Sequence, residues 1–201
     1  MNKGKLIVFS APSGCGKGTM LAEILKCENY RCSVSATTRE AREGEIDGVN
    51  YYFISDEEFE QKIRDNAFLE YAGYCKHYYG TLLSEVDDYL EKGIDVILEI
   101  EVQGAMKVME KRTEAVSIFV APPSVSELRR RLKKRGTESD EVIEERVSEA
   151  AGEISLAEKY DYVIVNDALE DAVSDFFAIM RAEKLKAEFS GDIINEVLKN
   201  A

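Results

Sequence analysis

Short apolar runs alternate along this chain with stretches in which apolar residues recur at helical spacing. Lys5 to Ser10 (KLIVFS) is one such run, and it stops at a glycine-containing segment, Ala11 to Gly14. Between Met20 and Leu25, apolar residues recur with the period of an amphipathic helix. The start of the chain is therefore predicted to be a buried strand, a glycine loop and a helix, in that order.

Three later apolar runs also have the length of buried strands. A helical pattern from Gln103 to Lys111 separates the first two of them. Strands that alternate with helices form parallel sheets whose faces are both covered. The sequence therefore predicts an α/β fold, with a parallel sheet flanked by helices. The three runs are Ile94 to Ile100, Val116 to Val120 and Asp161 to Val165.

Two insertions interrupt this alternation. The first, Thr37 to Ser84, is polar and rich in tyrosine, and we call it the small lobe. It contains strand candidates at Tyr51 to Ile54 and Phe68 to Ala72, around a helix that Ser55 or Asp56 can cap. The pattern predicts a small α+β unit.

The second insertion, Ser124 to Lys159, is charged and helical, and we call it the lid. It breaks at Gly136 and Thr137, after which Ser139 or Asp140 can cap the next helix. This composition favours a mobile flap. Residues 1–36, 85–123 and 160–201 remain as the core domain.

The end of the chain carries a separate amphipathic pattern. We expect a last long helix to end near Glu188 and Gly191 to break the chain. The short tail that follows has apolar residues at helical spacing. Packing onto the domain is the expected role of this tail, and an oligomer contact is the alternative. The apolar residues of the tail are Ile193, Ile194, Val197 and Leu198.

Composition excludes several classes of protein. At 201 residues and 45% hydrophobic content, the chain can form one domain with insertions around a substantial core. Its net charge of −13 argues against general binding to nucleic acid or to anionic membranes. It has no apolar run near the ~20 residues of a membrane-spanning helix and no signal-peptide core. We therefore expect a cytoplasmic protein, and its oligomeric state stays open.

The cysteines and the basic run at Arg129 to Arg135 have simple interpretations. The four cysteines form no CxxC pair, so reduced thiols are expected and no zinc site is indicated. The basic run (RRRLKKR) is typical of a solvated helix face. Any bound anion must therefore be held by a local site. The cysteines are Cys15, Cys27, Cys32 and Cys75.

The glycine loop has the features of a phosphate-binding loop. The segment APSGCGKGT approximates the pattern GxxxxGK[ST], with Ala11 at the first glycine position and Gly18 at the hydroxyl position. Glycines let backbone N–H groups converge on phosphate oxygens, and the following helix adds a positive dipole. A glycine turn that merely opens a helix does not explain Lys17. The predicted nucleotide-binding residues are Ala11, Pro12, Ser13, Gly14, Cys15, Gly16, Lys17, Gly18 and Thr19.

The small lobe holds candidates for binding a second phosphate. Ser35, Arg39 and Arg42 lie within eight residues and Tyr51 follows them. Arginine forks grip phosphate in a bidentate manner, and a tyrosine hydroxyl can complete the cradle. The alternative is that these arginines form surface salt bridges with nearby glutamates. Those glutamates are Glu40, Glu43 and Glu45.

Two further residues of the small lobe can read a nucleobase. Glu70 lies in FLEYA, and Thr81 follows Tyr79 and Gly80. A carboxylate beside a hydroxyl matches a base edge with neighbouring donors and an acceptor, as in guanine. An ordinary strand glutamate is the alternative for Glu70.

Taken together and in this order, the motifs resemble those of the guanylate kinases over Lys5 to Leu185. The resemblance implies a P-loop nucleoside-monophosphate kinase fold, in which the small lobe binds GMP and the lid is helical. It implies transfer of the γ-phosphoryl group of Mg²⁺-bound ATP to GMP, and to dGMP, giving ADP and GDP. The motifs are APSGCGKGT, SVSATTREAREGEIDGVNYYF, FLEYA, YYGT, LEIEVQGA and RGTESDEVIEER.

The resemblance also implies roles for individual residues. Asn166 matches a position near adenine, Thr19 and Glu99 match ligands of Mg²⁺, directly or through water, and Arg131 is a further lid arginine. The implied catalytic residues are Lys17, Arg39, Arg42, Arg135 and Arg146. The implied GMP-binding residues are Ser35, Arg39, Arg42, Tyr51, Glu70, Tyr79, Thr81 and Glu101.

Two other functions remain as alternatives. A guanylate-kinase-like module that binds peptides without catalysis typically lacks an intact phosphate loop, whereas Gly14, Gly16 and Lys17 are all present here. A related P-loop kinase acting on a sugar phosphate would not need Glu70 and Thr81. The single histidine, His77, is expected at the surface, because transfer to an ionised phosphate oxygen needs no general base.

Overall fold

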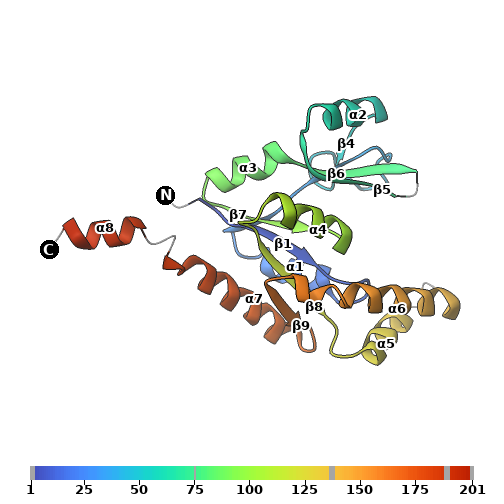
Figure 1. The fold of residues 1–201 in the computed structure, drawn as a ribbon. Coiled ribbons are helices and arrows are strands. Elements are labelled where there is room, and N and C mark those ends of the chain that lie inside the picture. The colour runs from blue at the N-terminus through green and yellow to red at the C-terminus, as the bar shows by residue number, and fades with distance from the viewer. Residues whose placement is uncertain (1–2, 75, 136–138, 188–190, 200–201) are drawn as a thin grey trace.

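A computed structural model describes residues 3–74, 76–135, 139–187 and 191–199 of the chain. Figure 1 shows a central sheet with helices on both faces, the small lobe at the upper right above α4, and the helices α5 and α6 at the lower right. No helix among the described residues is long and apolar enough to cross a membrane. The α/β architecture agrees with the sequence pattern.

The central sheet has five parallel strands in the order β2-β7-β1-β8-β9. The four apolar runs form β1, β7, β8 and β9, as predicted. The pattern missed β2, because this strand has only three residues and carries the exposed Arg31. The bounds are β1 Leu6–Ser10, β2 Tyr30–Cys32, β7 Asp95–Glu99, β8 Val116–Ala121 and β9 Tyr162–Val165.

Strand β1 divides its side chains between two hydrophobic clusters. Ile7 and Phe9 point to one face, which α1 (Lys17–Ile24) and α7 (Leu169–Lys184) cover. Leu6 and Val8 point to the other face, which α3 (Leu83–Glu91) and α4 (Val102–Lys111) cover. Burying an aliphatic or aromatic side chain contributes about 1.5–3 kcal/mol, so this strand anchors both layers. The loop that follows β1 is therefore attached to the best-packed part of the molecule.

The small lobe is a second, four-stranded sheet in the order β4-β3-β6-β5, with α2 packed on it (Figure 1). Helix α2 starts as predicted, since the Glu58 backbone N–H donates to the Ser55 hydroxyl at 3.1 Å. Strand β6 escaped prediction because its sequence, HYYGTL, has little apolar alternation. The bounds are β3 Ser35–Thr37, β4 Tyr52–Phe53, α2 Asp56–Arg64, β5 Phe68–Tyr74 and β6 His77–Leu82.

The small lobe does not stand apart from the core domain. Leu69 of β5 is 2% exposed and belongs to the hydrophobic cluster that α3 and α4 form on the central sheet. The Lys111 ammonium of α4 also donates to the Leu69 carbonyl oxygen at 2.9 Å. Helix α4 therefore packs against both the central sheet and the sheet of the small lobe.

Helices α5 (Val125–Arg135) and α6 (Asp140–Ile154) pack against each other over the predicted lid. Ser139 caps α6, and Gly136 and Thr137, the predicted break, lie outside the described residues. Much of the basic run on α5 is neutralised by local ion pairs, as expected for a solvated helix face. These pairs are Arg129 with Glu144, Arg130 with Glu127 and Lys133 with Asp140.

The tail forms a separate helix, as its amphipathic pattern indicated, but its bounds and its packing differ from the prediction. Helix α7 ends at Lys184, short of Glu188, and α8 (Gly191–Lys199) starts at the glycine that was expected to break the chain. In Figure 1, α8 extends away from the sheet and does not pack onto the domain. Its side chains confirm this, because Ile194, Val197 and Leu198 are 49%, 65% and 67% exposed. An amphipathic pattern identifies an apolar face but not its partner.

Candidate active site

The loop between β1 and α1 has the backbone geometry of an anion-binding loop. Gly14 and Gly16 have φ angles of 90° and 82°, a left-handed region that favours glycine. Space also requires glycine at both positions. A Cβ at Gly14 would lie 2.8 Å from Leu132 Cδ2, and one at Gly16 would lie 2.5 Å from Asn166 Nδ2. The loop therefore depends on both conformation and close packing.

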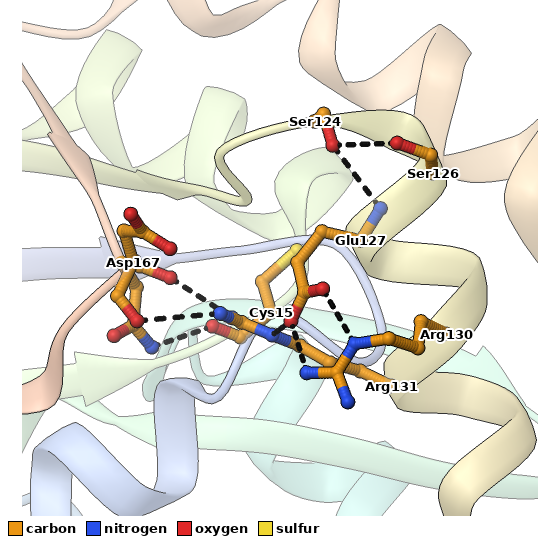
Figure 2. Close-up of polar contacts among 8 residues, drawn as sticks. Cys15, Ser124, Ser126, Glu127, Arg130, Arg131 and Asp167 are labelled. Carbon is orange, nitrogen blue, oxygen red and sulfur yellow. Dashed lines mark hydrogen bonds and ion pairs between the residues drawn. The ribbon is translucent and has the colours of Figure 1, made fainter.

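Asn166 holds this loop from behind. Its side chain is buried and donates from Nδ2 to the Cys15 carbonyl oxygen at 2.8 Å. Arg131 of α5 donates in turn to the Asn166 carbonyl oxygen at 2.9 Å and to the Glu127 carboxylate at 2.8 Å. Figure 2 shows Arg131 reaching from α5 toward Asp167, with Glu127 and Cys15 beside it. A chain of hydrogen bonds thus connects the α5 helix to the backbone of the loop.

Lys17 is the first residue of α1 and lies largely out of solvent. Its ammonium donates to the Ile100 carbonyl oxygen at 3.3 Å, at the carboxyl end of β7. Burial lowers the pKa of the Lys17 ammonium below its usual value, and the carboxylates of Glu99, Glu101 and Glu153 oppose that shift. The loop therefore presents a cation whose charge is balanced by acidic groups around it.

Thr19 and Glu99 are the predicted metal ligands at this edge of the sheet. Thr19 is the third residue of α1 and is exposed, and Glu99 is the exposed last residue of β7. Within the described ranges, no group of three or more histidine, cysteine or acidic side chains is arranged to hold a metal ion. One hydroxyl and one carboxylate fit Mg²⁺, which usually keeps several waters and is held by one or two carboxylates together with the phosphates of a substrate.

Arg146 of α6 lies at the phosphate loop. One of its terminal nitrogens donates to the Ser13 hydroxyl at 3.1 Å. The structure therefore brings a lid arginine next to a loop residue that is 133 positions away in the sequence. Arg135 is the last residue of α5, and its side chain is outside the part that the structure describes.

Arg39 in the small lobe forms a bidentate ion pair. Its two terminal nitrogens donate to the two oxygens of Glu45, each at 2.9 Å, and the Arg42 backbone N–H donates to the same carboxylate at 2.7 Å. These hydrogen bonds lower the pKa of Glu45 to about 2. The glutamate pairing that the sequence offered as an alternative is thus present.

Two tyrosines complete this cluster. The Arg39 guanidinium lies 5.4 Å from the centre of the Tyr51 ring, and the Tyr51 and Tyr79 rings meet edge to face at 5.9 Å. We call Arg39, Arg42, Glu45, Tyr51 and Tyr79 the arginine cradle. The sequence analysis named Arg39, Arg42, Tyr51 and Tyr79 as GMP-binding residues and named Glu45 only as a competing partner of the arginines.

Glu70 and Thr81 form a buried pair on neighbouring strands. The Thr81 hydroxyl donates to Glu70 Oε1 at 2.9 Å, and Thr81 and Glu70 are 0% and 8% exposed. Burial raises the pKa of the Glu70 carboxyl, opposed by the bonds from Thr81 and by the charges of Lys107 and Lys111. Ser35 lies directly opposite Thr81 on β3. The carboxylate of Glu70 is therefore buried and hydrogen-bonded within the small-lobe sheet.

The remaining side chains of the lobe have packing roles or lie elsewhere. Tyr71 and Tyr78 pack against Phe59, with ring centres at 6.4 Å and 5.3 Å. His77 was expected at the surface, but it is half-buried as the first residue of β6. Glu101, predicted to contact guanine, is exposed at the N-terminus of α4.

The cysteine thiols agree with the sequence analysis as far as they are described. Cys15, Cys27 and Cys32 form no disulfide, and Cys75 lies outside the described residues. Cys15 is buried in the phosphate loop, and burial raises the pKa of Cys32 to about 11. Cys32 therefore lacks the lowered pKa of a nucleophilic cysteine.

Comparison with known proteins assigns the chain to a family. A family model described as guanylate kinase matches residues 3–183. Guanylate kinase of Clostridium tetani is 51% identical over 194 residues, which cover 96% of this chain and 93% of the relative. A guanylate kinase of Thermus thermophilus is 48% identical over 197 residues, covering 98% of this chain and 90% of the relative.

A solved structure shows the same architecture. The crystal structure of guanylate kinase from Anaplasma phagocytophilum superposes with a TM-score of 0.72 at 40% identity, covering 92% of this chain and 89% of the other. The region that the family model matches includes the phosphate loop, the small lobe and both lid helices. On the sequence, the fold and these relatives, the chain belongs to the guanylate kinase family.

Proposed function

We propose that this protein transfers the γ-phosphoryl group of ATP to GMP, and to dGMP, giving ADP and GDP. One observation carries the choice of acceptor. The small lobe holds both an arginine cradle of phosphate-binding character, centred on the loop between β3 and β4, and the buried Glu70–Thr81 pair on its sheet. A nucleoside monophosphate needs both kinds of site, one for its phosphate and one for its base.

Glu70 supports guanine as the base. Guanine presents N1–H and its 2-amino group as adjacent donors, which one carboxylate can accept together. Adenine lacks the 2-amino group and has an unprotonated N1, so a buried carboxylate facing it would lose both partners. Thr81 can donate to the guanine O6 once it turns from Glu70. Ser35 and Glu101 are the further contacts that we propose at the base or its edge.

The arginine cradle supports binding of the GMP phosphate. The Arg39 guanidinium donates to both Glu45 oxygens and to the Glu40 carbonyl oxygen at 2.7 Å. We propose that its other N–H groups bind phosphate oxygens. Arg42, Tyr51 and Tyr79 would complete the site. Glu45 would then keep Arg39 oriented while the phosphate binds.

The phosphate loop, Ala11 to Thr19, would hold the phosphates of ATP. Its backbone N–H groups and the start of α1 attract the anion, and Lys17 would reach the β- and γ-phosphates. Arg135 and Arg146 would approach the same phosphates when α5 and α6 close. Asn166 would shape the loop and border the adenine site.

The chain contributes position and charge to the reaction and little covalent chemistry. The attacking oxygen of GMP is already ionised, so no general base is needed and the transfer is in line. Lys17, Arg39, Arg42, Arg135 and Arg146 would neutralise the charge of two polyanions and of the moving phosphoryl group. Closure of the lid over the site would exclude water, which otherwise hydrolyses ATP.

Mg²⁺ is the cofactor that we propose, held by Thr19 and Glu99 directly or through water. It would neutralise charge on the β- and γ-phosphates. We also assign residues 37–84 as the GMP-binding lobe and residues 124–159 as the lid. We propose the cytoplasm as the location, because free thiols are typical of compartments that keep cysteines reduced.

The test is a comparison of phosphoryl acceptors. Steady-state kcat/KM would be measured with ATP and Mg²⁺ against GMP, dGMP, AMP, UMP and sugar phosphates such as ribose bisphosphate. We expect turnover with GMP and dGMP and at least about a hundredfold lower kcat/KM with the other acceptors. A sugar phosphate as the best acceptor would instead support the related P-loop kinase.

A further inference from the structure

A glycine occupies a helical position where its cost needs a reason. Gly104 is the third residue of α4, and glycine destabilises a helix relative to alanine. Its φ angle is not positive, so no special backbone conformation requires it. The space beside it explains the choice.

A side chain at this position would crowd the carboxylate of Glu70. A Cβ built on Gly104 lies 3.3 Å from Glu70 Oε2 and 3.8 Å from Glu70 Cδ. This first distance is shorter than ordinary van der Waals contact, so the carboxylate would have to move by a few tenths of an ångström. The next contact, Ile100 Cβ at 3.8 Å, is unstrained. Glu70 is thus the one neighbour in this set that an added methyl group would displace.

The backbone of Glu70 cannot easily retreat from α4. Lys107 and Lys111 follow Gly104 by three and seven positions, so the three residues lie on one face of the helix. The Lys111 ammonium donates to the Leu69 carbonyl oxygen at 2.9 Å, and the Lys107 ammonium donates to the Tyr71 carbonyl oxygen at 3.4 Å. The residues on both sides of Glu70 are therefore tied to α4.

The Glu70 side chain is also held from the opposite side. Its Oε1 accepts the hydrogen bond from Thr81, which is fully buried, while its Oε2 faces Gly104. The carboxylate thus lies between a hydroxyl and a helix surface without a side chain. A movement away from α4 would disturb the Thr81 hydrogen bond.

We propose that Gly104 is a positioning residue for base selectivity: by leaving room beside α4, it sets the Glu70 carboxylate where it can accept both donors of guanine. This inference rests on the proposed function, since it assigns Gly104 a role only if Glu70 reads the base. It extends that function by making α4 of the core domain part of the specificity site of the small lobe.

The variant Gly104→Ala tests the proposal, because it should lower the activity with GMP without lowering the stability of the protein. The displaced carboxylate should lower kcat/KM for GMP about three- to tenfold, because small misplacements of a binding group are costly. The value for AMP should stay unchanged, since adenine cannot use the same contact. The melting temperature should stay the same or rise by about 1–4 °C, because alanine favours the helix. If Gly104 had only a structural role, the Gly104→Ala variant would instead lose stability and would lose activity with GMP and AMP together.

Gly152→Ala is the matched control. Gly152 is the third residue from the end of α6, and a Cβ there meets nothing within 4 Å. This variant should show the same direction of stability change and an unchanged ratio of GMP to AMP kcat/KM. An equal loss of the ratio in both variants would overturn the assignment, because it would show that the effect does not come from the contact with Glu70.

A double variant separates this proposal from the proposed function. In a Glu70→Gln background, Gly104→Ala should change the GMP-to-AMP ratio by less than about twofold, because it acts through the carboxylate. An undiminished effect there would refute action through Glu70. If the GMP-to-AMP ratio of kcat/KM is unchanged in Gly104→Ala but lowered in Glu70→Gln, the role of Gly104 is refuted and the proposed function stands. An unchanged ratio in Glu70→Gln itself would remove base reading by Glu70, and both proposals with it.

Discussion

The molecule has two candidate phosphate sites that are built in different ways. The phosphate loop presents backbone N–H groups, and buried contacts such as the bond from Asn166 to Cys15 fix its shape. The arginine cradle presents side chains, in a largely exposed loop, and an ion pair between Arg39 and Glu45 orients them. The first site depends on the fold of the core domain, whereas the second depends on local electrostatics.

This difference predicts which functions fail together. Damage to the supports of the phosphate loop should change stability and ATP use at once, since the same buried contacts serve both. Damage to the arginine cradle should mainly change GMP use and lower stability only modestly, because its ion pair orders a loop of the small lobe and not the hydrophobic core. Four substitutions test this contrast, from the largest expected effect to the smallest.

Lys17→Met should cause the largest loss. We expect kcat to fall by at least about 10²–10³-fold, because Lys17 would balance charge on the β- and γ-phosphates where that charge shifts during transfer. The fold should survive, since burial already disfavours the Lys17 charge and lowers its pKa. Steady-state kinetics and a melting curve check both statements. A near-native kcat of Lys17→Met with GMP would contradict a catalytic role of Lys17.

Arg146→Ala should lower kcat about tenfold to a hundredfold, with a smaller change in KM for GMP. The reason is that Arg146 lies at Ser13 in the phosphate loop and would act on the transferring group. Arg129→Ala, which removes the exposed ion pair with Glu144, is the control and should stay near wild type. An increase confined to KM for GMP would place Arg146 on the other substrate.

Asn166→Ala should lower the stability of the protein and impair its use of ATP at the same time. It leaves the Cys15 carbonyl oxygen without its buried donor, at a cost of about 1–3 kcal/mol, or roughly 2–12 °C in melting temperature. We expect KM for ATP to rise severalfold while KM for GMP changes little. Thermal denaturation and both KM values are the measurements. An unchanged melting temperature would show that the loop does not depend on this bond.

Glu45→Gln should have the smallest effect, and this effect should concern KM for GMP, whereas that of Asn166→Ala concerns KM for ATP. It weakens the orientation of Arg39 and should raise KM for GMP about three- to tenfold at an unchanged KM for ATP. The pKa of Glu45 is lowered to about 2 in the folded protein, below its usual 4.5. Its contribution to stability is therefore present above about pH 4.5 and is lost as the pH falls toward 2.

Acid titration of unfolding checks the second part of this prediction. Near pH 7 the wild type should melt above Glu45→Gln, and this difference in melting temperature should shrink as the pH falls from about 4.5 toward 2. A lower KM for GMP in the variant would mean that Glu45 competes with the phosphate, contrary to a positioning role.

The core domain was predictable because its signals are local. Buried strands such as β1 and β8 are apolar runs, and the phosphate loop needs only neighbouring glycines and a lysine. The small lobe was less predictable. Strand β6 contains tyrosines and glycine, with one leucine at its end, so its periodicity is weak, although the resemblance had marked Tyr79 and Thr81.

Contacts between distant segments could not be predicted from the pattern. The bond between Asn166 and Cys15 joins residues 151 positions apart, and Gly104 meets Glu70 only because α4 packs on β5. The role of Glu45 was hidden for another reason. Three glutamates near Arg39 are equivalent in sequence, and only the loop geometry selects the one that binds both Arg39 and the Arg42 backbone.

The most direct measurement concerns the acceptor base. Values of kcat/KM for GMP and AMP in the wild type and in Glu70→Gln test whether one buried carboxylate distinguishes guanine from adenine. Leaving a buried partner unpaired costs about 1–3 kcal/mol, and more when it is charged, so we predict that the GMP-to-AMP ratio narrows by roughly a hundredfold. Thr81→Ala should narrow it less, because its hydroxyl can also accept from the adenine amino group. An unchanged ratio in Glu70→Gln would contradict the account and favour a sugar-phosphate acceptor.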